Sequence, residues 1–234
     1  MHIKVIYEDN DVLVIDKPAG LVVFPEGQTK ENTLIGTLIK ENPELESVGE
    51  PPRYGVVHRL DKDTSGLLLV AKNNKSLIFL QKQFKNRKVE KKYICLVEGI
   101  IKTERGRVET LIGRSPSDRR KQKAYPLSDL GRGKREAITE YRVLERFDGY
   151  TLLEVRIKTG RRHQIRCHFS YLQHPVAGDK LYGFKNSKTP KGLTRHFLHA
   201  AYIKIQLPNG ENKEFSSELP EELKNVLENL KKIN

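Results

Sequence analysis

The stretch VVHRLDKDTSGLLLV, residues 56–70, decides how this chain is organised. A charged tetrapeptide, residues 58–61, follows an apolar pair and precedes a Thr-Ser-Gly turn and a β-type apolar run. A buried ion must be paired or must shift its pKa, so Asp61 beside a buried strand needs a partner. Gly66 allows a backbone geometry that a side chain would forbid. The residues alone fit a charged loop in which Asp61 caps a turn equally well.

Composition indicates a soluble chain with a substantial core. The 234 residues suffice for one large domain or two small ones, and 31% of them are charged, which predicts a highly charged surface. No apolar run approaches the roughly 18 residues of a membrane span. The N-terminus lacks the apolar region of a signal peptide. We therefore expect a cytoplasmic protein without membrane contact.

Cysteine and histidine spacing argues against a metal site. Cys95 and Cys167 lie in separate apolar stretches, and we expect both to be reduced core thiols. No Cys-x-x-Cys spacing occurs, and His163 and His168 are five residues apart, which suits one helix face poorly. The spacing of these residues therefore predicts no metal site.

The charge balance favours a polyanionic partner. With 43 Lys and Arg against 30 Asp and Glu, the net charge is +13, and such an excess favours phosphate binding through counterion release. An inert basic surface and an anionic membrane are the alternatives, but no long basic amphipathic helix supports the membrane. Charge alone does not separate RNA from DNA.

The densest basic stretch is GRSPSDRRKQK, residues 113–123. No apolar residue interrupts it, so we expect an exposed loop whose Arg119, Arg120 and Lys121 contact phosphate. A loop that is only solvated is the plainer interpretation.

A second charged motif, TGRRHQIRCHF, spans residues 159–169. The pattern predicts a helix that Thr159 and Gly160 open and that runs to about residue 172. Ile165 lies on its apolar side, and Arg162 and Arg166 share another side because they are four residues apart. An amphipathic helix with solvated cations fits the same pattern.

The remaining sequence predicts an α+β domain with a mostly antiparallel sheet. Strands are expected over residues 3–7, 12–16, 21–25, 91–99, 137–144, 150–157 and 202–207. Helices are expected over 33–39 with Asn32 as cap, from Asn73 or Asn74 to about residue 86, and after Pro220. In the second of these helices the residues expected to be buried are Leu77, Ile78, Phe79, Leu80 and Phe84.

Residues 58–67 resemble the His-Arg-Leu-Asp-x-x-Thr-Ser-Gly-Leu signature of the RluA family of pseudouridine synthases at every specified position. Residues 160–168 resemble its Gly-Arg-x-His-Gln-Ile-Arg-x-His motif, Lys91 and Tyr93 its Lys-x-Tyr motif, and residues 174–183 its His-Pro-x-x-Gly-Asp-x-x-Tyr-Gly segment. The resemblance covers essentially the whole chain. It implies one pseudouridine synthase catalytic domain over residues 1–234, with a mixed, mostly antiparallel central sheet flanked by helices and loops.

The resemblance also implies the chemistry, which is isomerisation of uridine to pseudouridine in RNA without a cofactor. It makes Asp61 the nucleophile and Arg166 its ion-pair partner. Tyr93 stacks on the uracil or positions a proton acceptor, and Arg59 fills the space that the flipped base vacates. Lys91 and Ile165 are the further substrate contacts. Attack on C6 of the base, attack on C1′ and a glycal route all remain open.

Two rival functions fit parts of the sequence. A non-catalytic RNA-binding or ribosome-assembly protein would use a degenerate version of this fold, against which the intact Asp61 and Arg166 argue. A nuclease would bind metal through Asp61 and Asp63, but no third carboxylate is evident. We expect a monomer without an obligate protein partner, acting on ribosomal or transfer RNA. We expect no N-terminal S4 RNA-binding domain, because family-like sequence begins within the first few residues, and this expectation slightly favours small stem-loop substrates.

Overall fold

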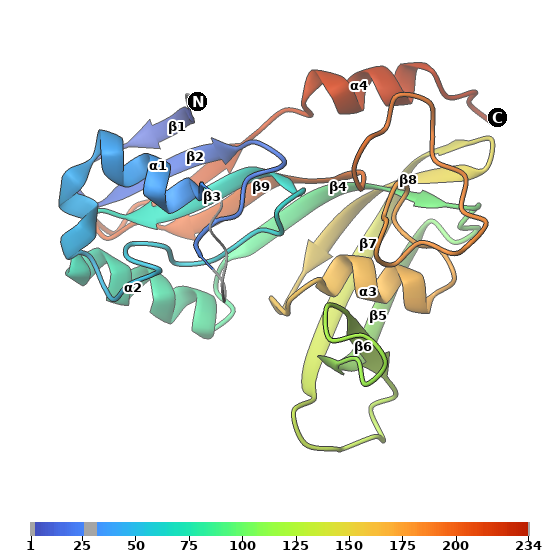
Figure 1. Ribbon diagram of the computed structural model, residues 1–234, viewed down its shortest axis with the longest axis horizontal. Helices are drawn as coiled ribbons and strands as arrows, with labels where there is room; N and C mark the ends of the chain where they lie inside the picture. Colours follow the sequence, from blue (N-terminus) through green and yellow to red (C-terminus); the bar gives the residue numbers. More distant parts are fainter. Residues whose placement is uncertain (1–2, 26–31, 234) are drawn as a thin grey trace. The chain divides into compact units, whose positions relative to one another are not determined.

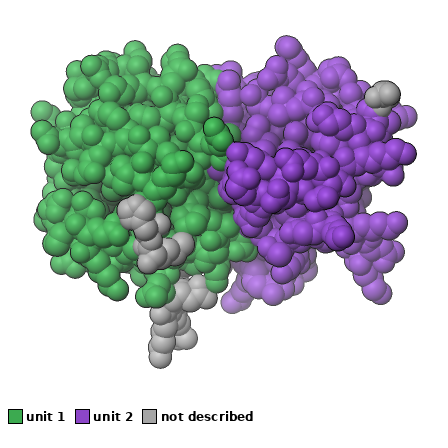
Figure 2. Space-filling model, turned by 90° about the horizontal axis from the view of Figure 1, so that it is seen from above, with its two compact units in different colours: residues 1–90, 200–218 green, residues 91–199, 219–234 purple. Residues whose placement is uncertain are grey.

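The computed structural model describes residues 3–25 and 32–233. Its internal contacts divide the chain into two compact units, coloured separately in Figure 2. The first unit comprises residues 1–90 and 200–218, and the second comprises residues 91–199 and 219–234. The predicted α+β class with a mostly antiparallel sheet is confirmed.

The first unit is built on a sheet whose strands follow the order β1, β2, β3 and β9, with β10 paired to β9 (Figure 1). Antiparallel pairing joins β1 to β2, β2 to β3 and β10 to β9. Nearly every side chain of β2 and β3 is buried, as expected for strands with continuous apolar sequence. The bounds are β1 Lys4–Glu8, β2 Val12–Lys17, β3 Ser65–Ala71, β9 Leu198–Gln206 and β10 Asn212–Ser216.

Two helices and a 3-10 turn complete this unit: α1 Leu34–Glu41, η1 Pro43–Ser47 and α2 Asn74–Lys85. The cap of α1 is Thr33 and not Asn32, because the Thr33 hydroxyl accepts the Gly36 N–H at 3.2 Å. Asn73 caps α2 as predicted. Ile78 was wrongly placed on the buried side, since it is 68% exposed. The strand predicted over residues 21–25 is also wrong, because only Val22 forms a bridge, to Thr33.

The second unit contains a five-stranded antiparallel sheet in the order β4, β8, β7, β5 and β6. Helix α3 packs on one face, where both ring nitrogens of His168 contact threonine hydroxyls, Thr110 on β5 at 3.0 Å and Thr139 on β7 at 2.9 Å. Helix α4 packs on a cluster that includes Leu96 of β4 and Leu152 of β8. The bounds are β4 Glu90–Glu98, β5 Arg105–Arg114, β6 Gln122–Tyr125, β7 Arg135–Phe147, β8 Tyr150–Ile157, α3 Gln164–Tyr171 and α4 Glu221–Glu228.

Helix α3 begins five residues later than the sequence predicted. His163, at φ 54°, adopts the left-handed conformation immediately before the helix, so a helix cannot continue through it. The Thr159 hydroxyl instead accepts the Ile138 N–H at 2.9 Å and bonds the Gln164 side chain at 2.8 Å. Thr159 therefore ties the preceding loop to β7 and does not open the helix.

Both cysteines are free and buried, which confirms them as core thiols. Burial raises the pKa of the Cys167 thiol to about 12. No helix within residues 3–25 and 32–233 is long and apolar enough to cross a membrane.

Candidate functional site

Asp61 lies half-buried immediately before the turn that leads into β3. The Thr64 N–H donates to the Asp61 carbonyl oxygen at 3.1 Å and closes this turn. Gly66 has φ +114°, and a Cβ there would lie 2.3 Å from the Ala200 carbonyl oxygen of β9. Only glycine fits so close to another backbone, so the Thr-Ser-Gly sequence fixes where β3 starts after Asp61.

The Lys17 side chain binds the backbone of this turn. The side chain is fully buried, and its Nζ donates to the carbonyl oxygens of Pro18, Leu21 and Lys62 at 2.8, 2.8 and 2.9 Å. The Gly20 N–H donates to the same Lys62 carbonyl at 3.0 Å. A buried ammonium is stable only when its donors are satisfied, so these bonds tie residues 18–21 to the residue that follows Asp61.

The two residues that open the first motif have defined structural partners. The Nε2 atom of His58 accepts the Leu69 N–H at 3.0 Å, and its ring stacks on Phe84 with centroids 4.7 Å apart. The guanidinium carbon of Arg59 lies 5.0 Å from the centroid of the Phe24 ring. This cation–π geometry gives Arg59 a resting position over an aromatic side chain.

Lys91 and Tyr93 project from β4 of the second unit on the same face, since they are two residues apart. Tyr93 is only 8% exposed. Burial lowers the pKa of Lys91 to about 8. A lysine with so low a pKa exchanges its proton near neutral pH more readily than an exposed one.

Arg166 makes a two-pronged ion pair with Asp179. Its Nε lies 2.6 Å from Oδ2 and its Nη2 lies 2.9 Å from Oδ1. The Oδ1 atom also accepts the backbone N–H groups of Leu181 and Tyr182, at 2.9 and 3.0 Å. Burial alone would raise the pKa of Asp179, but the hydrogen bonds and charge of Arg166, together with the charge of His196 and the Tyr182 N–H, hold the pKa below its usual value. Asp179 therefore stays ionised and fixes the direction of the guanidinium.

The predicted basic loop is the tip of a hairpin between β5 and β6, residues 115–121. Arg119 and Arg120 are exposed as predicted. The Arg120 guanidinium binds Asp118 through Nε at 3.0 Å and Nη2 at 2.8 Å, which lowers the pKa of Asp118 to about 2. Lys121 is half-buried, with its Nζ 6.0 Å from the Tyr182 ring centroid, so the expectation of a fully exposed run is wrong at this residue.

The predicted site residues are divided between the units. Arg59 and Asp61 belong to the first, and the second contains the others, namely Lys91, Tyr93, Arg119, Arg120, Lys121, Ile165 and Arg166. The pairing of Asp61 with Arg166 stays a prediction. Sequence reasoning missed Lys17 and Asp179 as supports, although a lysine ending an apolar strand and an aspartate within a family-like segment were the available signals. Within the described residues, no three His, Cys, Asp or Glu side chains are grouped to hold a metal ion.

Comparison with known proteins gives one answer. The sequence profile of the RNA pseudouridylate synthase family matches residues 11–171. An uncharacterized RNA pseudouridine synthase of Aquifex aeolicus is 44% identical in an alignment of 232 positions that covers 96% of this chain and 72% of that protein. Ribosomal large subunit pseudouridine synthase D of Xanthomonas campestris is 41% identical, over 98% of this chain and 70% of that protein.

A solved structure agrees. Human RNA pseudouridylate synthase domain containing 1 superposes with a TM-score of 0.79 at 27% identity, covering 99% of this chain and 89% of that one. The resemblance to the RluA family is therefore confirmed by sequence and by fold. The chain belongs to the RNA pseudouridylate synthase family and is an RNA pseudouridine synthase, an isomerase.

Proposed function

We propose that this enzyme isomerises uridines of ribosomal RNA with Asp61 as its nucleophile and without a cofactor. The proposal rests on the hydrogen bonds that fix the turn around Asp61. Its carboxylate emerges half-buried from a turn whose next carbonyl is bound by both the Lys17 ammonium and the Gly20 N–H. A carboxylate held in one place suits covalent catalysis, because orientation supplies much of the rate.

The reaction needs a catalytic group that bonds to the base or the sugar, or removes a proton, and is then released unchanged. The N1–C1′ bond breaks, the uracil turns, C5 bonds to C1′, and the proton from C5 is lost while N1 gains one. A carboxylate performs the addition and departure without being consumed. The target base must first leave its stack, which costs a few kcal/mol and favours a loop or distorted uridine.

The other predicted site residues, most of them in the second unit, supply the remaining roles in this proposal. Asp179 orients the Arg166 guanidinium, and Arg166 in turn keeps the nucleophile ionised, because a nearby cation lowers the pKa of a carboxyl. Tyr93 stacks on the uracil or positions the proton acceptor. Lys91 and Ile165 line the substrate site beside Tyr93 and Arg166, and Arg59 leaves its place over Phe24 to fill the vacated stack. Arg119, Arg120 and Lys121 at the hairpin tip contact phosphate.

Ribosomal RNA is the favoured substrate because of the relatives. The proteins of Xanthomonas campestris and Haemophilus ducreyi, 41% and 36% identical to this chain, are named ribosomal large subunit pseudouridine synthases. Transfer RNA stem-loops are the second substrate class to test, since they too present unstacked uridines.

Pseudouridine mapping tests substrate and nucleophile together. Ribosomal and transfer RNA are sequenced for pseudouridine from cells that lack the gene and from the same cells complemented with wild type, Asp61→Asn or Asp63→Asn. We expect a site in large-subunit ribosomal RNA to disappear on deletion, and to return with wild type and Asp63→Asn but not with Asp61→Asn. If the deletion removes pseudouridine only from transfer RNA, transfer RNA is the substrate. If Asp61→Asn restores the site, Asp61 is not the nucleophile.

A further inference from the structure

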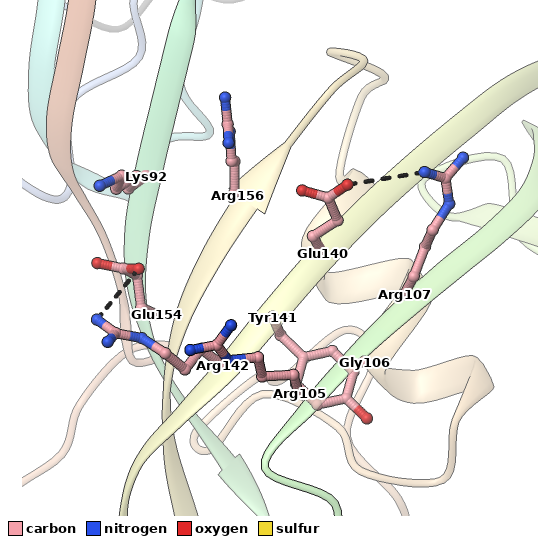
Figure 3. A pocket seen from close by; sticks show the side chains of 9 residues that line it. All are labelled: Lys92, Arg105, Gly106, Arg107, Glu140, Tyr141, Arg142, Glu154 and Arg156. Carbon is pink, nitrogen blue, oxygen red and sulfur yellow. Dashed lines mark hydrogen bonds and ion pairs between the residues drawn. The ribbon is translucent and has the colours of Figure 1, made fainter.

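An open groove of about 650 Å³ lies on the second unit, over β4, β8, β7 and β5 (Figure 3). The groove is distinct from every residue placed above in the candidate site. Its lining is Lys92, Arg105, Gly106, Arg107, Glu140, Tyr141, Arg142, Glu154 and Arg156. Five of these residues are cationic and two are carboxylates, so the groove is basic overall.

Strand alternation explains where the groove lies. Leu96 and Leu152 are directly paired across β4 and β8 and are covered by the cluster around α4. Two and four residues further along β8 on the same face come Glu154 and Arg156, and four residues back along β4 comes Lys92. The same face thus changes from apolar to charged.

The charges form two rows that follow the strand register. Lys92 pairs with Arg156, Arg156 with Glu140, and Glu140 with Arg107. The second row joins Glu154 to Arg142 and Arg142 to Arg105. Side chains directly across neighbouring strands on one face lie close together, so the guanidinium groups line one continuous surface.

The carboxylates hold the arginines without neutralising the groove. Glu140 lies 3.7 Å from Arg107, and Glu154 lies 3.4 Å from Arg142 (Figure 3). The Arg107 and Arg142 side chains nevertheless remain 52% and 50% exposed. Arg107 also donates to Glu109 through Nε and Nη2, at 3.1 and 2.8 Å. A guanidinium has five N–H donors, so both arginines keep donors beyond these bonds. Arg105 is exposed and makes no ion pair or side-chain hydrogen bond with the described residues.

We propose that this groove binds the sugar–phosphate backbone of the substrate RNA, away from the nucleotide that is modified. Arginine forks match phosphate oxygens in two-pronged geometry, and the chain's net charge of +13 favours a polyanion. The carboxylates Glu140 and Glu154 accept hydrogen bonds from ribose 2′-hydroxyls. RNA presents such a hydroxyl on every nucleotide, whereas the acidic side chains of an acidic peptide carry none. RNA therefore fits the mixed lining better than an acidic protein does.

The groove and Tyr93 lie on opposite faces of the same sheet. Lys92 faces the groove, and its neighbour Tyr93 faces the other way, as successive strand residues do. Helix α3 also packs on the face away from the groove, because its His168 contacts the hydroxyl of Thr139 at 2.9 Å, and Thr139 precedes groove-facing Glu140 on β7 and therefore faces the other way. Binding in the groove can thus be tested separately from the chemistry, and it does not depend on which residue is the nucleophile.

The test compares two triple variants with equal loss of charge. The groove variant is Arg105→Gln, Arg142→Gln and Arg156→Gln. The control is Lys75→Gln, Lys82→Gln and Lys85→Gln, three exposed cations on α2 of the first unit. Affinity for a fluorescein-labelled RNA hairpin with long duplex flanks is measured over a range of salt concentrations, with circular dichroism to confirm folding.

We expect the groove variant to bind this RNA at least tenfold more weakly and its salt slope to fall by about two to three, the value for three lost phosphate contacts. The control should change both quantities much less. Equal losses in both variants would show a general charge effect and overturn the proposal. Unchanged RNA binding combined with lost binding of polyglutamate would assign the groove to an acidic protein instead. Asp61→Asn should keep the groove-dependent affinity, so the outcome is independent of the nucleophile assignment.

Discussion

Two arginine–aspartate pairs in the second unit have nearly the same geometry and very different surroundings. Arg166 and Asp179 join through Nε and Nη2 with side chains 9% and 0% exposed. Arg120 and Asp118 join through the same atoms, but their side chains are 78% and 24% exposed. Exposed pairs contribute little because water and salt screen them. Breaking a buried pair leaves an uncompensated charge and costs much more.

The difference in burial indicates that the two pairs have different roles, one in stabilising the fold and the other at a surface that can contact RNA. The buried pair links α3 to the segment after it, with backbone N–H groups of Leu181 and Tyr182 completing the carboxylate's hydrogen bonds. The exposed pair only shapes the hairpin tip, since Asp118 also accepts the Arg120 backbone N–H at 2.9 Å. The first fixes a guanidinium for the proposed site, and the second leaves cations available to solvent and phosphate.

Removing the buried charge should have the largest effect on stability. Asp179→Asn should lower the free energy of unfolding by about 3–5 kcal/mol, because the buried Arg166 loses its counter-charge. Urea denaturation measures the loss. The double variant Arg166→Met, Asp179→Leu should recover part of it, since neither charge then remains buried. A loss as small as that of an exposed pair would show that burial is not what distinguishes the two.

Acid should destabilise the protein through His168. Burial lowers the pKa of His168 to about 4, from the ordinary histidine value of about 6.5, so the unfolded chain binds more protons between these pH values. Stability present above pH 6.5 is therefore lost as pH falls toward 4, by about 3 kcal/mol in total. Urea denaturation at several pH values should show this loss in wild type and a shallower one in His168→Gln. Equal pH dependence in both proteins would contradict the assignment.

Lys17 is a buried cation that donates to three backbone carbonyl oxygens. Lys17→Met should cost about 2–3 kcal/mol, because the carbonyls of Pro18 and Leu21 lose a donor. Turnover should fall further than stability explains, since the Lys62 carbonyl beside Asp61 is also released. The measurement is single-turnover rate at a temperature where the variant is fully folded, with the exposed Lys75→Met as control. Normal turnover in folded Lys17→Met would mean that the turn does not need this anchor.

The smallest effect is expected at the exposed pair. Asp118→Asn should leave the melting temperature unchanged, because the pair is screened by solvent. RNA affinity should stay the same or rise, as Arg120 is released from its carboxylate for phosphate. Weaker RNA binding by Asp118→Asn would show that the pair holds the tip in its binding conformation.

Several elements could be read from the sequence because their signals are local. Alternation of apolar and polar residues predicted the β7–β8 hairpin, and Asn73 marked the start of α2. The helix predicted to open at Thr159 begins only at Gln164, because Thr159 is bonded to β7 and His163 is left-handed. The local sequence shows neither feature. Strands β5, β6 and β10 were not predicted. They are recognised from their pairing, of β5 with β6 and β7 and of β10 with β9.

The candidate site was predictable to the extent that it is a contiguous motif. The positions of Asp61, Tyr93 and Arg166 came from family-like strings. Their supports did not, because Lys17 is 45 residues from Lys62 and Asp179 is 13 residues from Arg166. The basic groove also escaped sequence reasoning, since its cations are scattered along four strands and only the register brings them together.

The most direct test of the account is the single-turnover yield of pseudouridine by Asp61→Asn and Asp63→Asn, measured in EDTA on ribosomal RNA. Asp61→Asn keeps shape and volume but removes the charge, so we predict a folded protein with RNA affinity within about tenfold of wild type. Its turnover should fall by more than the roughly 10²–10⁴-fold typical of losing a general acid or base. Asp63→Asn should retain turnover. Substantial turnover by Asp61→Asn, or its loss in Asp63→Asn alone, would contradict the assignment of the nucleophile.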